Sequence, residues 1–247
     1  YPGFIDPYTS YGLPKLDKPK PSDKPIYDNV RKGGNATNGA VHASYRAVKS
    51  FSPDSKTAQA YLKNGFTSVQ TARFDGIFRG VGATVSLGEG IANDLILSGS
   101  TRQFMSFNKG TSQQAYPSSL MGSVALIRQT LSDANWYKSA YGKTDLRFQE
   151  QAVEYNSDLA VLRNLENMGV IFEPGSQQSV LRADGIMDNF NVSTIQVASG
   201  YEYARIDDIK RTKNSFIVPV NFPAAPDVAD INDGNDVNLS HLRHWER

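Results

Sequence analysis

The sequence predicts an α/β protein built around a parallel sheet. From residue 55 onward, helix-like segments alternate with short strands, and these strands are apolar and β-branched, as in strands that are covered on both faces. The length of 247 residues is enough for one large α/β domain or two small ones. Alternation of this kind indicates either a barrel or a doubly wound fold.

Composition excludes several classes of function. Lys plus Arg is 26 and Asp plus Glu is 25, so a net charge of +1 gives no electrostatic case for a nucleic-acid partner or an anionic membrane. The absence of cysteine excludes disulfides, thiolate zinc sites and a cysteine nucleophile. We expect no membrane span, because the chain has no run of about 18 apolar residues.

The two ends predict a piece of a longer protein. The chain starts in strand-like sequence without an initiator Met or a basic leader, and it stops in the helix-like SHLRHWER without a cap. We therefore expect residues 1–247 to form one segment of a chain that continues in both directions.

The N-terminal region is expected to contain a strand followed by a long loop. The first six residues, YPGFID, predict a buried strand that ends in the carboxylate of Asp6. Residues 14–38 are rich in Pro, Lys, Asp, Asn and Gly, which predicts an extended, solvated surface loop; a binding loop of this length is the less common case.

Four helix–strand units are expected after this loop. In the first, a helix over 55–64 ends at Gly65, because glycine adopts the left-handed conformation without Cβ strain, and FTSVQT follows as a strand. The other three units are a helix over 157–168 with Ser157 as cap and Gly169 as stop before VIFE, a helix over 177–189 before STIQVAS, and a helix over 202–213 before SFIVPV.

Two further segments lie between these units. A long helix is expected from Ser118 to Tyr137, with Ser118 or Ser119 as its cap. Its apolar residues recur every three or four positions and predict core packing: Leu120, Val124, Ile127, Leu131 and Ala134. The glycine-rich run at 79–90 fits neither a dinucleotide site nor a phosphate loop, and it predicts a glycine-bent strand and turn.

The residues offer little support for a metal site. Of the three histidines, His42 has no second ligand close in sequence. His241 and His244 are three residues apart on one face of a predicted helix and would need a third ligand from elsewhere; the simpler interpretation is two polar, partly exposed side chains. The acidic run at 227–238 misses the spacing of a calcium-binding EF-hand and is ordinary turn chemistry.

Four carboxylates are candidates for chemistry because they lie at or just after predicted strands: Asp6, Asp75, Glu173 and Glu202. In a parallel barrel these strand ends form the functional face. Each carboxylate could equally cap a helix or form an ion pair. A serine hydrolase is not supported, because the sequence has no Gly-x-Ser-x-Gly motif.

YPGFID resembles the first barrel strand of the amidohydrolase superfamily, in which Pro-Gly-Phe/Leu-Ile-Asp precedes a His-x-His pair that binds metal. Here Pro2 to Asp6 match, and Pro7, Tyr8 and Thr9 replace the rest. Glu173 stands near a second metal-binding His position of the family, and Tyr201 occupies the His position of a Gly-His-Glu motif. The resemblance extends over further segments, with the helix as its most specific part: 64–76, 116–137, 170–176, 195–205, 215–223 and the C-terminal LSHLRHWER.

This resemblance implies an incomplete TIM-type barrel from the exported, imidazolonepropionase-like bacterial branch, in which the metal-binding His positions are replaced. It implies a periplasmic or cell-surface location, no metal in this segment and zinc in the complete protein. The segment would be non-catalytic, with a structural role or with a ligand or partner bound at the strand ends by Tyr8, Glu173 and Tyr201. Its partner would be the remainder of the polypeptide or a second amidohydrolase-like half.

Two alternatives stay open. The chain could be part of an active metal-dependent hydrolase of amide or peptide-like bonds, with metal ligands outside this chain or with Glu173, His241 and His244. It could also be a subunit of a cell-envelope assembly in which residues 14–38 contact an envelope protein.

Overall fold

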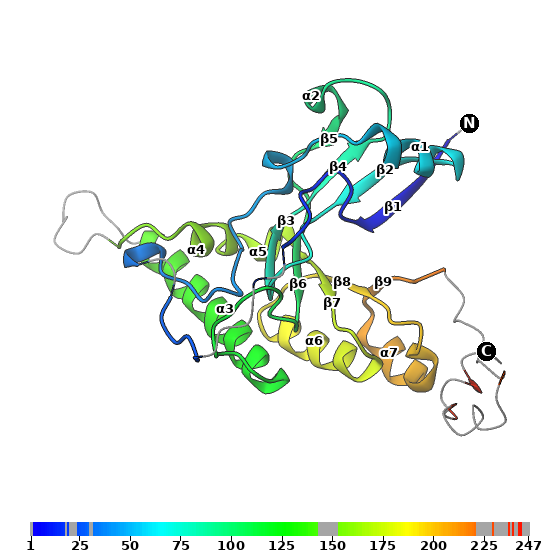
Figure 1. The fold of residues 1–247 in the computed structure, drawn as a ribbon. Coiled ribbons are helices and arrows are strands. Elements are labelled where there is room, and N and C mark those ends of the chain that lie inside the picture. Colours follow the sequence, from blue (N-terminus) through cyan, green and yellow to red (C-terminus); the bar gives the residue numbers. More distant parts are fainter. Residues whose placement is uncertain are drawn as a thin grey trace.

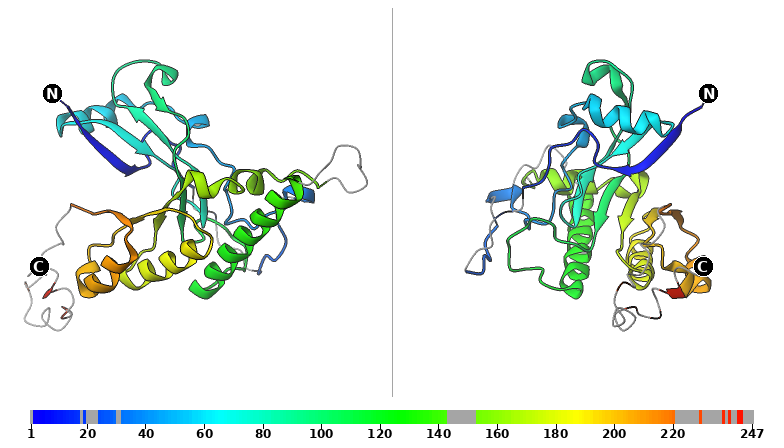
Figure 2. Two further views of the ribbon diagram at one scale, coloured as in Figure 1. Left: turned by 180° about the vertical axis from the view of Figure 1, so that it is seen from behind. Right: turned by 45° about the vertical axis from the view of Figure 1, so that its right-hand side comes forward.

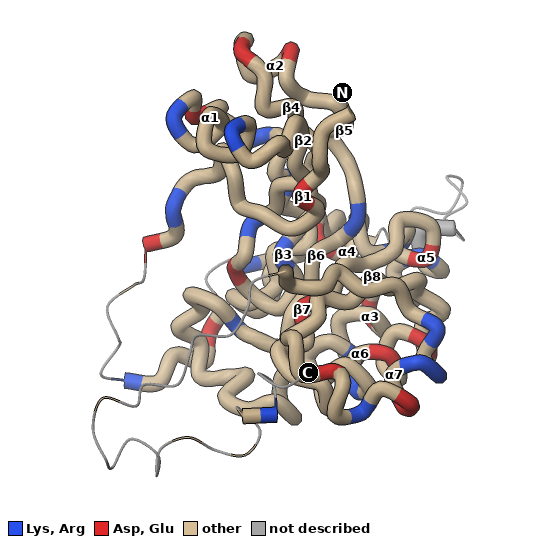
Figure 3. Tube along the Cα trace, turned by 90° about the vertical axis from the view of Figure 1, so that its right-hand side faces the viewer, with Lys and Arg blue, Asp and Glu red and all other residues tan. Residues whose placement is uncertain are grey.

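The structure is a computed structural model that describes residues 2–17, 19, 24–29, 32–142 and 153–220, with single residues at 229, 237, 239, 242 and 243. The described chain is a mixed α/β fold with two sheets, one above the other in Figure 1. Both signs of charge are spread over the sheets and helices (Figure 3). No helix in this part of the chain is long and apolar enough to cross a bilayer.

The first sheet has four strands in the order β1-β2-β4-β5. Only its first pair is parallel. The strands are β1 (Phe4–Thr9), β2 (Phe66–Thr71), β4 (Ala83–Ser86) and β5 (Ile96–Ser98). Helix α1 (Ser55–Lys63) packs beside β2, and the short α2 (Ala92–Leu95) leads into β5.

The second sheet has five strands in the order β3-β6-β7-β8-β9, of which the last four run parallel. The strands are β3 (Phe78–Val81), β6 (Gln103–Ser106), β7 (Val170–Glu173), β8 (Thr194–Val197) and β9 (Ser215–Ile217). The predicted parallel sheet is therefore confirmed for β1–β2 and for β6 to β9, and it is wrong for β3, β4 and β5.

Two of the antiparallel pairs, β3–β6 and β4–β5, arise from one long hairpin that runs through both sheets, and the third pairs β4 with β2. The first arm of the hairpin is β3 and β4, separated only by Gly82, and its second arm is β5 followed by β6. Each arm bends where it passes from one sheet to the other, at Gly82 in the first arm. There the Gly82 amide donates to the Arg102 carbonyl over 3.2 Å, and the Thr101 amide donates to the Gly82 carbonyl over 3.1 Å. A Cβ at Gly82 would lie 2.6 Å from the ring of Phe104, so the bend needs glycine. The predicted glycine-bent strand is confirmed.

The prediction of a buried first strand is wrong. Phe4 is 68% exposed and Ile5 is 62% exposed, although both lie in β1. The reason is that β1 is an edge strand of its sheet, paired only with β2 among the described strands. An apolar run has the same pattern in an edge strand as in a central one, so sequence alone does not separate the two cases.

The helices of the first and third units agree with their predictions. Helix α1 ends at Lys63, and Gly65 follows with φ +84°. Asp54 caps α1 by accepting the Lys56 amide. Helix α6 (Gln177–Asn189) has its expected bounds.

The second predicted helix is broken. Residues 157–168 form α4 (Ser157–Leu162) and α5 (Leu165–Met168), because Asn164 leaves the helical conformation and its side chain bonds locally to Asn167. The cap is Asn156 rather than Ser157, and it accepts the amides of the two residues at 158 and 159.

The fourth predicted helix is also divided. It forms a 3-10 turn, η4 (Glu202–Arg205), followed by α7 (Ile206–Thr212). Arg205 separates the two pieces with φ −137° and ψ 34°, and the Glu202 carboxylate bonds backwards to the amides of Ser199 and Gly200.

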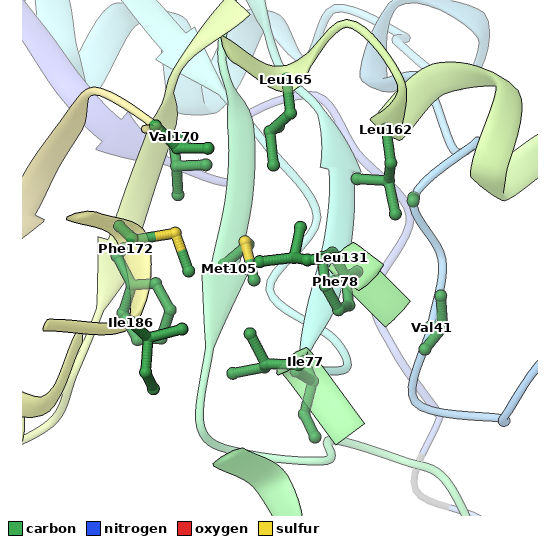
Figure 4. Packing of buried hydrophobic residues seen from close by; sticks show 14 of the residues in the cluster. Val41, Ile77, Phe78, Met105, Leu131, Leu162, Leu165, Val170, Phe172 and Ile186 are labelled. Atoms are coloured by element: carbon green, nitrogen blue, oxygen red, sulfur yellow. The ribbon is translucent and has the colours of Figure 1, made fainter. Parts of the chain in front are cut away.

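The main core lies between the five-stranded sheet and the helices on one of its faces (Figures 2 and 4). Helix α3 (Leu120–Gly142) is capped by Ser119 and supplies most of its predicted apolar stripe to this core: Ile127, Leu131 and Ala134 are buried and Val124 packs at the edge. Leu120 instead remains 37% exposed. A smaller cluster covers the opposite face, with Phe104 and Ile171 packed against Tyr8 and Phe74.

Residues 24–29 of the 14–38 segment lie against the turn at 108–115, whereas Gly34 and Thr37 bond to Glu154 and Asp158. Ile26 forms a β-bridge with Gln114, whose side-chain amide donates to carbonyls of 27–28 and to Asn29. The short 3-10 turns η1 (Gly33–Asn35) and η2 (Ala47–Lys49) then lead the chain to α1.

Candidate functional site

Arg79 is the centre of a polar cluster at the end of the five-stranded sheet. It lies in β3 and is only 5% exposed. Its Nη2 is 2.6 Å from Oε2 of Glu173, its Nη1 donates to the Tyr8 hydroxyl over 2.9 Å, and its Nε donates to the Gly76 carbonyl over 3.3 Å. The Glu173 carboxylate also acts electrostatically on the Tyr8 hydroxyl. The Arg79 guanidinium therefore joins Tyr8 to Glu173.

The cluster links the two sheets. Tyr8 comes from β1 of the four-stranded sheet, whereas Glu173 is the last residue of β7 in the other sheet. The Tyr8 ring stacks on Phe74 at 4.4 Å, and the Arg79 guanidinium lies 5.6 Å from the centre of the same ring. This packing holds both polar groups against an apolar surface.

Tyr8 is a neutral phenol. Burial raises its pKa well above the usual value, and the charge of Arg79 only partly offsets this effect. The carboxylate of Glu173 raises the pKa further. Tyr8 therefore serves as a hydrogen-bonding hydroxyl rather than as an anionic ligand.

A second cluster surrounds Asp75, whose side chain is fully buried. Its Oδ1 accepts the Thr111 amide over 2.7 Å, and its Oδ2 lies 2.5 Å from Arg73 and 3.7 Å from His42 Nε2. Burial alone would raise the pKa of Asp75, but the hydrogen bonds from Thr111 and the charge of Arg73 outweigh it, so the pKa lies below its usual value. Asp75 thereby anchors the turn that contains Thr111.

Two clefts lie on either side of this turn and share Asn108 and Lys109 in their walls. The first, which we call the loop groove, has a volume of about 800 Å³ and runs between the turn at 108–115 and residues of the 14–38 segment. The second, which we call the strand-end cleft, has a volume of about 630 Å³. It opens at the carboxyl ends of β6 and β7, beside the start of α3.

The residues at the strand ends do not fit a zinc centre. Zinc is held by neutral imidazole, thiolate or carboxylate groups, whereas Tyr8 is a neutral phenol and one oxygen of Glu173 is paired with Arg79. A divalent ion bound by both of these residues would lie beside a guanidinium cation. Within the described residues, no three His, Cys, Asp or Glu side chains are arranged to hold a metal ion.

The structure brings together two of the three predicted ligand-binding residues, Tyr8 and Glu173. Tyr201 lies near Tyr203, with ring centres 6.4 Å apart, and it lines neither cleft. His241 and His244, the weak metal candidates, and the acidic run at 227–238 fall almost entirely outside the described residues.

The remaining carboxylate candidates have local structural partners. Asp6 accepts the Tyr8 amide over 3.0 Å, and Glu202 accepts the Ser199 amide over 2.7 Å. Arg79 was not among the predicted site residues. The available signal was an arginine between Phe78 and Gly80 in an otherwise apolar run, since a buried cation needs a partner.

Comparisons with known proteins agree with this fold. No protein-family model matches the chain, and no curated protein sequence matches it. Among solved structures, an amidohydrolase from Thermotoga maritima MSB8 is similar, with a TM-score of 0.69 and 16% identity. The match covers 99% of this chain and 63% of the other, so this chain spans less than two thirds of the length of that protein. At this identity the similarity concerns the fold, which is therefore amidohydrolase-like.

Proposed function

We propose that this chain is a non-catalytic segment of an exported amidohydrolase-like protein, in which an arginine replaces the catalytic metal. The observation that carries the proposal is the position of Arg79, which bonds to both Tyr8 and Glu173. Tyr8 belongs to the segment that replaces the His-x-His pair of the resemblance, and Glu173 stands near a second metal-binding His position.

The chemistry of the three side chains supports this proposal. A hydrolytic metal ion activates a bound water by lowering its pKa toward neutrality. A guanidinium stays protonated and offers only hydrogen-bond donors, so Arg79 has no coordination site for a water nucleophile. Its charge is instead balanced by the Glu173 carboxylate at 2.6 Å.

We also propose that the two sheets are parts of an incomplete TIM-type barrel. Parallel pairing of β1 with β2 and of β6 through β9 supports it, as does the share of the structural neighbour that has no counterpart here. Two edge strands, β1 and β9, have exposed apolar residues in or after them: Ile5 within β1 is 62% exposed and Val220 beyond β9 is 93% exposed. We propose that the rest of the polypeptide, or a second amidohydrolase-like half, covers these edges.

Metal analysis of the purified protein tests the proposal. The full chain is incubated with excess zinc, desalted and analysed for bound metal, with a chelator-treated sample as the control. We expect far less than one zinc ion per chain. Retention of about one ion per chain, the stoichiometry of a catalytic centre, would overturn the proposal and favour an active hydrolase with His241 and His244 as ligands.

A further inference from the structure

The strand-end cleft is suited to binding a small molecule. It lies where two parallel strands end, and Ser106 of β6 is in register with Glu173 of β7 at its floor. Ligands of parallel α/β folds bind at such carboxyl ends. The volume of about 630 Å³ lies in the usual range for small-molecule sites.

One wall of the cleft consists of hydrogen-bond donors. The hydroxyl of Ser106 accepts the Asn108 amide over 3.1 Å, and that of Ser119 accepts the Gly122 amide over 3.2 Å. Neither hydroxyl donates a hydrogen bond within the described residues, so each can donate its own hydrogen to a ligand. Lys109 donates to the Gln114 carbonyl over 2.9 Å and retains further hydrogens.

Ser123 gives independent support for a ligand. The residue is only 4% exposed and lines the cleft, and its Oγ is not among the fully buried atoms without a hydrogen-bond partner, so the hydroxyl is open to the cleft. A ligand that fills the cleft would cut this hydroxyl off from water, so it must itself accept the serine hydrogen to avoid the cost of an unpaired polar group. Ser123 lies one turn into α3, whose positive N-terminal end opens on the same cleft.

The opposite wall offers one strong acceptor. The Glu173 side chain is 38% exposed and lines the cleft, while its Oε2 is held by Arg79. A carboxylate accepts hydrogens and donates none, so the ligand must present a donor at this wall. Because Arg79 balances the charge of Glu173, an anionic group elsewhere on the ligand is not strongly repelled.

We propose that the strand-end cleft binds a small carboxylate that also carries an amino or hydroxyl group, such as a free amino acid or a hydroxy acid. The ligand carboxylate accepts hydrogens from Ser119, Ser123 and Lys109. Its amino or hydroxyl group donates to Glu173. This inference rests on the proposed function, because a metal bound at Glu173 would change the same wall.

Four ligands with one carbon skeleton test the chemistry. The full chain, labelled with ¹⁵N, is titrated with L-alanine, L-lactate, propionate and L-alaninamide while the backbone amide signals are recorded. We expect L-alanine or L-lactate to shift the signals of residues 119–123. Propionate and L-alaninamide each lack one of the two groups and should bind roughly 10- to 100-fold more weakly, the value of a charged hydrogen bond.

A pair of serine variants on one helix provides the site test. Ser123→Ala should weaken binding of the preferred ligand roughly 2- to 10-fold, the value of one hydrogen bond. Ser132→Ala changes an exposed serine of the same helix and should leave the affinity unchanged. Equal weakening by both variants, similar affinity for all four ligands, or no shift with either L-alanine or L-lactate would overturn the inference.

Metal analysis of the same sample separates the two proposals. Bound zinc at about one ion per chain would end the proposed function. Metal-free protein that binds none of the four ligands would end only the ligand inference.

Discussion

Removing either partner of the Arg79–Glu173 ion pair should destabilise the fold, but by different amounts. The Arg79 side chain is 6% exposed and that of Glu173 is 38% exposed. Glu173→Met leaves a buried guanidinium without its counter-charge, and we expect a cost of about 3–4 kcal/mol in the free energy of unfolding. Arg79→Met leaves a carboxylate that water can reach, so solvation offsets much of the loss and the expected cost is about 1–2 kcal/mol.

The assay is urea denaturation of the two single variants and the double variant, followed by circular dichroism. The double variant should cost less than the sum of the singles by about 2 kcal/mol, because the second substitution removes the unpaired charge left by the first.

The surface pair Lys138–Glu166 is the matched control. Its atoms are 3.0 Å apart, but its side chains are 51% and 41% exposed, so the same cycle should give less than about 0.5 kcal/mol. Additive single costs at Arg79 and Glu173, or a larger cost for Arg79→Met than for Glu173→Met, would refute the reasoning.

Three further predictions concern the surroundings of this pair. Because the pKa of Asp75 is lowered, its contribution to stability is complete above the unfolded value of about 4 and is lost as the pH falls through the folded value; Asp75→Asn should remove this dependence from urea midpoints. Gly110→Ala places a Cβ 2.2 Å from Asp75 at φ +65° and should cost more than about 3 kcal/mol, whereas Gly175→Ala, at φ +82° in open space, should cost about 1 kcal/mol in the same assay. Tyr8→Phe removes an acceptor from buried Arg79 and should lower the unfolding free energy by about 1–3 kcal/mol without changing zinc content.

Local signals in the sequence predict most helices and strands correctly. The bounds of α6 follow from its periodicity, and the end of α1 follows from Gly65, since both depend on residues close in the chain. The break between α4 and α5 depends on whether Asn164 bonds locally or continues the helix, a small difference in energy that periodicity does not report. Exposure of Phe4 depends on which strand lies beside β1, which is a property of the whole sheet.

The candidate site is predicted only in part for the same reason. Tyr8 and Glu173 could be selected because each lies toward a strand end, in or near a segment where the resemblance places metal ligands. Arg79 is 71 residues from Tyr8 in the chain and joins it only through the packing of two sheets. Its neighbours in sequence are glycine and apolar residues, which predict a bent strand and carry no information about an ion pair.

The contacts among Tyr8, Arg79 and Glu173 suggest a reason why a site without a metal ion would be retained. In the proposed function, the guanidinium keeps a cation at the strand ends and connects β1 of one sheet to β7 of the other. Each neighbour bonds to this cation, because Glu173 receives its counter-charge from Arg79 and the Tyr8 hydroxyl accepts a hydrogen from Arg79. A histidine substituted at Tyr8 alone would face the fixed guanidinium rather than an open coordination site. If the proposed function holds, a metal centre would therefore need changes at residues 8, 79 and 173 together, because the contacts to Tyr8 and Glu173 are made by the same guanidinium.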